Sequence, residues 1–103
     1  MNLSENLLQG TLPTTIGLLT SFHQIYLSYN QISGTLPTQL GNLHLLTSFF
    51  IANNRFVGTV PAQLSTLPLS SLYIEGNSDL CTCYMMDHPV LDCQKNYIST
   101  TCD

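Results

Sequence analysis

The chain of 103 residues contains few charged side chains, because Asp, Glu, Lys and Arg together make up 8% of it. Its basic residues are Arg55 and Lys95, and the formal net charge is -4. Nucleic-acid binding needs several Lys or Arg to neutralise phosphates, and a polybasic membrane anchor needs a cluster of them, so the composition excludes both. No apolar run approaches the roughly 18 residues that a transmembrane helix requires. We therefore predict no nucleic-acid partner and no membrane span within this chain.

Signatures of catalysis are lacking as well. The histidines, His23, His44 and His88, have no acid and nucleophile at the spacing of a catalytic motif. Carboxylates are sparse, and no phosphate-binding loop is present. We therefore predict that the protein is not an enzyme, has no catalytic residues and binds no cofactor.

What the sequence does contain is an internal repeat. The phrase Gly-Thr-Leu-Pro occupies residues 10–13 and 34–37, and Gly-Thr-Val-Pro occupies residues 58–61. Four asparagines recur at nearly the same interval, namely Asn6, Asn30, Asn54 and Asn77. Apolar residues stand three and five positions before them, as Leu27 and Ile25 do before Asn30. This alternation predicts one strand per repeat with a single buried face, and such strands stack in parallel.

The second half of each repeat supplies the crossover that parallel strands need. Gly34 can take backbone angles closed to other residues, Pro37 suits the first position of a helical turn, and Gly41 suits its end. Residues 37–41 are therefore predicted to form one short helical or 3-10 turn. A single repeat cannot bury its apolar face alone, so the repeats must stack on one another.

This pattern resembles the leucine-rich repeat family in its 24-residue plant-type form, N-x-L-x-G-x-[IL]-P-x-x-L-G-x-L, as in receptor-like proteins and polygalacturonase inhibitors. The Gly-Thr-Leu-Pro variant is also similar to repeats of protist surface proteins. The resemblance covers residue 3 to about residue 80. It implies a leucine-rich-repeat solenoid, a right-handed superhelix with one parallel β-sheet on the concave side and short helical or 3-10 turns on the convex side. We expect residues 1–80 to hold one partial repeat and about three further repeats.

The recurring asparagines have a structural interpretation. They stand at a turn out of each strand and face inward, where a buried amide must satisfy backbone groups. In the resembling family they form a hydrogen-bonded ladder. That role is therefore implied for Asn6, Asn30, Asn54 and Asn77.

All four cysteines follow residue 80, at Cys81, Cys83, Cys93 and Cys102. Cys81 and Cys83 are too close in an extended chain to bridge easily, which leaves Cys81–Cys93 with Cys83–Cys102, or Cys81–Cys102 with Cys83–Cys93. Residues 81–103 resemble the C-terminal cysteine cap of extracellular leucine-rich repeat proteins, in which the first cysteine usually joins the third, and this resemblance favours the former pairing. Disulfides imply an oxidising compartment, hence an extracellular or cell-surface location. The alternative is a zinc site that these cysteines form with His88.

The residues that alternate with the buried ones are predicted to point out from the concave face. One column of this face is aromatic and consists of Tyr26, Phe50 and Tyr73. The flanking positions are Gln24, Ser48 and Ser71, then Ser28, Ala52 and Glu75, then Tyr29 and Asn53 at the next edge. Aromatic residues are enriched at binding hot spots, so we predict that this set binds the ligand. Stacking across neighbouring strands is the alternative role of the aromatic column.

The resemblance implies a non-catalytic extracellular recognition module that binds a protein, peptide or glycan through the concave face. A structural or adhesive cell-surface element is the alternative. Ice binding is a minor alternative, because Thr11, Thr35 and Thr59 recur in a column. The chain opens inside a repeat, with no capping module before Leu3. We therefore expect a fragment of a longer array, open to self-association through its uncapped N-terminal edge.

Overall fold

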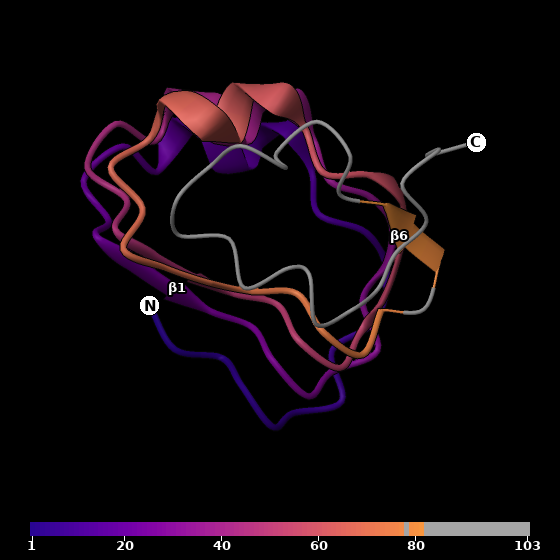
Figure 1. The fold of residues 1–103 in the computed structure, drawn as a ribbon. Helices are drawn as coiled ribbons and strands as arrows, with labels where there is room; N and C mark the ends of the chain where they lie inside the picture. Colours follow the sequence, from indigo (N-terminus) through magenta and orange to yellow (C-terminus); the bar gives the residue numbers. More distant parts are fainter. Residues whose placement is uncertain (78, 82–103) are drawn as a thin grey trace.

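The computed structural model describes residues 1–77 and 79–81, so the predicted disulfides and most of the predicted cap lie outside the described residues. The chain winds into stacked coils. Figure 1 looks along the stack, with the 3-10 helices on one side of the coil, β1 on the opposite side and β6 on a third. Each complete coil passes through a strand of one sheet, a strand of a second sheet and a 3-10 helix. This is the predicted solenoid.

The first sheet contains the strands that the apolar alternation predicts. They are β1 (Gln24–Tyr26), β3 (Ser48–Phe50) and β5 (Ser71–Tyr73), in the order β1-β3-β5. The strands are parallel, and the aromatic residues share one register position, with Tyr26 opposite Phe50 and Phe50 opposite Tyr73. Residue Asn2 bridges Tyr26 in the same parallel sense and continues the sheet toward the N-terminus.

A second parallel sheet, which the sequence analysis did not anticipate, lies further along each coil. It contains β2 (Ser33–Thr35), β4 (Arg55–Thr59) and β6 (Asp79–Cys81). Gly34 in β2 and Gly58 in β4 have φ values of 81° and 83°, which favour glycine. A Cβ atom on Gly34 would lie 2.8 Å from Cγ2 of Thr11, so glycine lets neighbouring coils approach closely. We expected a single parallel sheet, and the structure instead contains two parallel sheets in the described part of the chain.

The second sheet also corrects the expected threonine column. Thr35 pairs with Val57, and Thr11 bridges Ser33. Val57 stands two positions before Thr59, and Ser33 stands two positions before Thr35. Each threonine is therefore paired with the residue two positions before the next threonine of the series. The threonines are therefore staggered between neighbouring strands and do not stand opposite one another.

The third side of each coil is a short 3-10 helix. These helices are η1 (Thr14–Leu18), η2 (Thr38–Asn42) and η3 (Ala62–Thr66). Pro37 stands one position earlier than predicted, as the N-cap of η2, with an extended backbone at φ -71° and ψ 142°. Gly41 lies within η2 and does not end it. A Cβ atom on Gly41 would lie 2.7 Å from the Cβ of Gln63, so this glycine allows η2 and η3 to pack closely.

The core is a spine of apolar side chains that neighbouring coils share. Two of its columns are Ile25, Phe49 and Leu72, and Leu27, Ile51 and Ile74, all at most 3% exposed. Leu3 and Leu8 occupy the same repeat positions as Leu27 and Ile32, but they are 42% and 38% exposed. The first coil therefore leaves part of the spine open at the N-terminal edge.

Candidate functional site

The strands of the first sheet end at a network of buried asparagines. The Asn54 amide nitrogen donates to the Leu27 and Ile51 carbonyls at 2.8 and 3.1 Å, and its Oδ1 accepts from the Ile32 N–H at 3.1 Å. Asn30 makes the equivalent bonds one coil earlier, to the Leu3 and Leu27 carbonyls. Asn30 and Asn54 thus each join two coils and fix the sharp turn that follows the strand. The prediction is wrong for Asn6, which is exposed and whose amide donates, among the described residues, only to the Leu3 and Ser4 carbonyls of its own coil.

Before each asparagine the backbone turns through the left-handed region. Glu5, Tyr29 and Asn53 have φ values of 59°, 60° and 57°, and Gly76 takes 82° at the corresponding position. This conformation costs a residue with a Cβ roughly 1–2 kcal/mol, and asparagine tolerates it better than tyrosine or glutamate. Hydrogen bonds between coils hold these residues, because the Glu5 N–H donates to the Ser28 carbonyl and the Tyr29 N–H to the Ala52 carbonyl.

The predicted aromatic column is a packed stack. The Tyr26 and Phe50 ring centroids are 4.7 Å apart with planes at 59°. The Phe50 and Tyr73 centroids are 4.5 Å apart, edge to face at 73°. Such pairs contribute about 0.5–1.5 kcal/mol beyond the area they bury, so the column stabilises the sheet. All three side chains are half-buried and keep part of their surface accessible.

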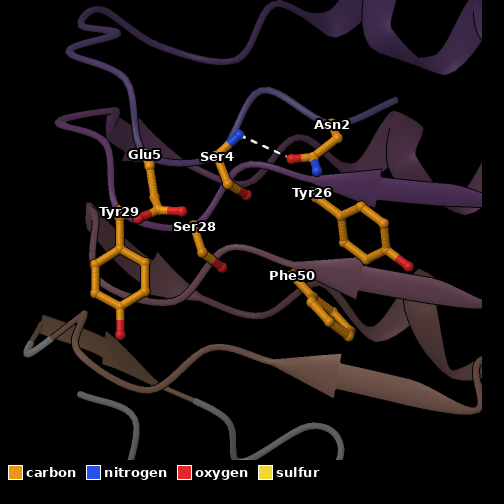
Figure 2. A pocket seen from close by; sticks show the side chains of 7 residues that line it. All are labelled: Asn2, Ser4, Glu5, Tyr26, Ser28, Tyr29 and Phe50. Carbon is orange, nitrogen blue, oxygen red and sulfur yellow. Dashed lines mark hydrogen bonds between the residues drawn. The ribbon is translucent and has the colours of Figure 1, made fainter.

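An open hollow of about 380 Å³ lies at the N-terminal end of this column. Its lining residues are Asn2, Ser4, Glu5, Tyr26, Ser28, Tyr29 and Phe50. Figure 2 shows their side chains on one face of the first sheet, with Glu5 pointing toward Ser28 and Tyr29, and with Tyr26 and Phe50 on the other side of Ser28. We call this region the aromatic hollow.

The structure brings only some of the predicted binding residues into the aromatic hollow. Tyr26, Phe50, Ser28 and Tyr29 line it. Gln24 and Asn53 are exposed, and Ser71, Tyr73 and Glu75 are half-buried, but none of these five lines the hollow. Ser48 is only 8% exposed, because the middle strand is covered by a neighbour on each side. The prediction that Ser48 is accessible is therefore wrong, and so is the outward placement of Ala52, which is 5% exposed.

Sequence reasoning missed three residues of the hollow. Asn2, Ser4 and Glu5 stand one repeat before Tyr26, Ser28 and Tyr29. Extending the outward columns backwards by one period would have found them. Asn2 is further ordered by its side chain, whose Oδ1 accepts from the Ser4 N–H at 3.1 Å.

The hollow carries negative charge at one end. Glu5 is exposed, and no hydrogen bond or ion pair among residues 1–77 and 79–81 engages its carboxylate. The basic side chain in the described part, Arg55, begins β4 in the second sheet. The amino group of Met1 donates to the Gln24 carbonyl at the start of β1, whereas Tyr29 follows the end of this strand.

Neither a metal site nor a membrane-spanning helix occurs in the described part of the chain. No group of three His, Cys, Asp or Glu within residues 1–77 and 79–81 is placed to hold a metal ion. None of the helices in those ranges has the length and apolarity needed to cross a membrane. The proposed zinc ligands Cys83, Cys93, Cys102 and His88 lie outside the described residues, as do both favoured disulfides.

Known proteins share this arrangement. The family model described as Leucine Rich Repeat matches residues 21–43. The structure of the plant peptide hormone receptor RGFR1 in complex with RGF2 is similar at 37% identity and a TM-score of 0.72, over 80% of this chain and 13% of that one. The ectodomain of BIR2 from Arabidopsis thaliana matches at 31% identity and a TM-score of 0.67, over 87% of this chain and 44% of that one.

A third similar structure is PEPR1-AtPEP1, at 26% identity and a TM-score of 0.74. It is matched over 88% of this chain and 13% of its own. No curated protein matches the chain in a sequence comparison. The chain spans between 13% and 44% of the length of these three similar structures.

The repeat spacing, the coils and these similarities agree. The protein belongs to the leucine-rich repeat family, and its repeats are of the plant type. This confirms the resemblance read from the Asn and Gly-Thr-x-Pro columns. The division into repeats over residues 1–80 and a cysteine cap over 81–103 stays a prediction.

Proposed function

We propose that the chain is a non-catalytic recognition module of an extracellular or cell-surface protein, and that it binds a peptide or an extended protein segment along the first sheet. The observation that carries the proposal is the aromatic hollow, where Tyr26, Phe50 and Tyr29 gather beside small polar side chains. Ligand sites are typically concave and apolar, with a few polar groups that orient the ligand. Aromatic side chains supply large contact areas at low entropic cost.

The similarities support a peptide ahead of a glycan. RGFR1 is described as a plant peptide hormone receptor, in complex with RGF2. Another similar structure is the LRR ectodomain of the plant membrane receptor kinase GASSHO1/SCHENGEN3, in complex with CASPARIAN STRIP INTEGRITY FACTOR 2. The ectodomain neighbours also support an extracellular or surface location for this chain. A glycan ligand and self-association through the open N-terminal edge stay predictions.

A structural or adhesive element is the second candidate, and one observation favours it. The stack of Tyr26, Phe50 and Tyr73 would be useful to a solenoid with no ligand, because each ring pair stabilises the sheet. Tyr29 separates the two functions. It is 60% exposed and takes no part in the ring pairs of the stack, so a purely structural role gives it little to do.

The test uses linear peptides selected from a random display library against the full chain. Binding of the selected peptides is then compared among the wild type, Tyr29→Ser, Phe50→Ser and the control Val57→Ser. Val57 is 38% exposed in the second sheet, away from the hollow. We expect Tyr29→Ser and Phe50→Ser each to weaken binding roughly tenfold or more, because truncated aromatic hot spots commonly cost about 2 kcal/mol.

The control is expected to bind as the wild type does. Thermal melting followed by circular dichroism checks that each variant is folded. If selected peptides bind all three variants equally, or if Phe50→Ser lowers the melting temperature while Tyr29→Ser leaves binding unchanged, the proposal is wrong and the structural role is favoured.

A further inference from the structure

We propose that the end of the aromatic hollow between Glu5 and Tyr29 binds a cationic side chain, the ammonium of lysine or the guanidinium of arginine, from a bound peptide. The inference rests on the proposed function, because it assigns a chemical class to one position of the peptide. It is carried by the placement of one carboxylate and one aromatic ring on consecutive coils, at the edge of a hollow with no basic side chain in its lining.

The Glu5 carboxylate is available to a ligand. The residue is exposed, lines the hollow and points across it toward Ser28 and Tyr29 (Figure 2). Within the described ranges 1–77 and 79–81, its carboxylate has no hydrogen-bond or ion-pair partner. Its backbone is nevertheless fixed, since the Glu5 N–H donates to the Ser28 carbonyl at 2.9 Å. The backbone that carries the carboxylate is therefore fixed, and no partner within the described ranges neutralises its charge.

Tyr29 brings a ring to the same end of the hollow. It is the equivalent of Glu5 one coil later, and its N–H donates to the Ala52 carbonyl at 2.9 Å. The chain keeps a bulky, 60% exposed side chain at φ 60°, a conformation for which Gly76 shows the unstrained solution. The same backbone conformation recurs at Glu5 and Asn53, so the turn is common to the coils, and what is particular to Tyr29 is its exposed ring.

Together these groups match a cation better than an anion or a neutral group. A lysine or arginine head within about 6 Å of an aromatic ring is attracted by the electron density of its face. A carboxylate beside the ring adds a charge-assisted hydrogen bond. The other polar groups of the lining, Asn2, Ser4 and Ser28, are neutral and offer oxygen acceptors. Arg55 begins β4 in the second sheet and is not among the residues that line the hollow.

The net charge acts in the same direction. The chain carries six acidic and two basic residues, for a formal charge of -4. A charge imbalance of this sign speeds the approach of cationic ligands at low salt. It does not by itself place them, which is why the local arrangement of Glu5 and Tyr29 is what the experiment must address.

The experiment titrates the isotope-labelled full chain by NMR with two tripeptides, acetyl-Gly-Arg-Gly-amide and acetyl-Gly-citrulline-Gly-amide. Citrulline has nearly the shape of arginine but no charge. We expect the arginine peptide to shift the Tyr26, Tyr29 and Glu5 resonances, and to bind roughly two- to fivefold more tightly than the citrulline peptide. Glu5→Gln is expected to remove most of this preference. Tyr29→Asn is expected to reduce the preference, because it removes the ring while asparagine can keep the left-handed backbone conformation.

Asp79→Asn is the matched control, since it removes one negative charge from an exposed residue of the second sheet. It is expected to keep the arginine preference. Equal binding of the two peptides to the wild type, or equal loss of preference in Asp79→Asn and Glu5→Gln, would overturn the cationic site. If the tripeptides leave the hollow unperturbed while display-selected peptides still lose binding in Phe50→Ser, the cationic site is wrong and the proposed function stands. If neither probe involves the hollow, both are wrong.

Discussion

Replacing one buried asparagine of the ladder tests how the coils are joined. In Asn54→Ala the Ile32 N–H loses its acceptor, the Asn54 Oδ1 at 3.1 Å. The Leu27 and Ile51 carbonyls each lose one bond but keep another, from Asn30 at 2.9 Å and from Asn77 at 3.0 Å. A buried N–H left without an acceptor costs about 1–3 kcal/mol. Each bond lost at a carbonyl costs at most about 1 kcal/mol, because that carbonyl keeps its second hydrogen bond. We therefore expect the free energy of unfolding to fall by about 3 kcal/mol.

Asn6→Ala is the matched comparison within the same ladder. Asn6 is exposed, and its amide donates to the Leu3 and Ser4 carbonyls at 2.9 and 3.1 Å. The Leu3 carbonyl also accepts from Asn30, and water can reach the rest. The expected loss is under about 1 kcal/mol. Urea denaturation followed by circular dichroism measures both variants. If the two substitutions cost the same, the buried hydrogen bonds of Asn54 do not stabilise the fold as expected.

Three further substitutions probe residues with positive φ. Tyr29→Asn is expected to raise the free energy of unfolding by about 0.5–1 kcal/mol, since asparagine tolerates φ 60° better than tyrosine; a fall in the melting temperature would contradict this. Gly76→Ala is expected to destabilise by more than about 2 kcal/mol, because strain at φ 82° is joined by a clash of the new Cβ with the Asn53 side chain. Gly10→Ala, at φ 87° with no atom within 4 Å of the new Cβ, should cost only about 1 kcal/mol. Thermal melts of the two glycine variants should therefore differ, and equal shifts would show that the clash is relieved elsewhere.

The buried columns were predictable because their spacing repeats. Ile25, Phe49 and Leu72 stand at one position of successive repeats, and side chains so related meet when coils stack. The same argument placed Tyr26 and Phe50 outward. It needed no knowledge of individual contacts, only the alternation within each strand.

The second sheet was not predictable in this way. Gly34 and Thr35 stand just before Pro37, and glycine and proline are depleted in strands, so local preference indicates a turn. The strand forms because the neighbouring coil supplies hydrogen-bond partners to an already extended segment, as when the Ser33 N–H donates to the Gly10 carbonyl at 2.8 Å. The local sequence does not reveal hydrogen-bond partners that lie on the neighbouring coil.

Only part of the aromatic hollow could be predicted from the repeat pattern. Tyr26, Ser28, Tyr29 and Phe50 belong to columns that the repeat defines. Glu5 was missed because its coil begins near the start of the chain and has no full strand to align. Ser48 was assigned to an accessible position because periodicity gives direction but not depth, and a small side chain in a middle strand is covered by its neighbours.

The close packing of the 3-10 helices has a consequence for how far the layer can extend. Gly17 and Gly41 let the following helix sit against them, since a Cβ on Gly17 would lie 2.8 Å from the Gln39 carbonyl oxygen. The next residue of that series is Ser65, which carries a Cβ and turns its hydroxyl back to the Ala62 carbonyl. A further helix would have to stand off from η3 by at least the width of that side chain. The close approach that glycine permits between η1 and η2 and between η2 and η3 is therefore not available on the outer side of η3.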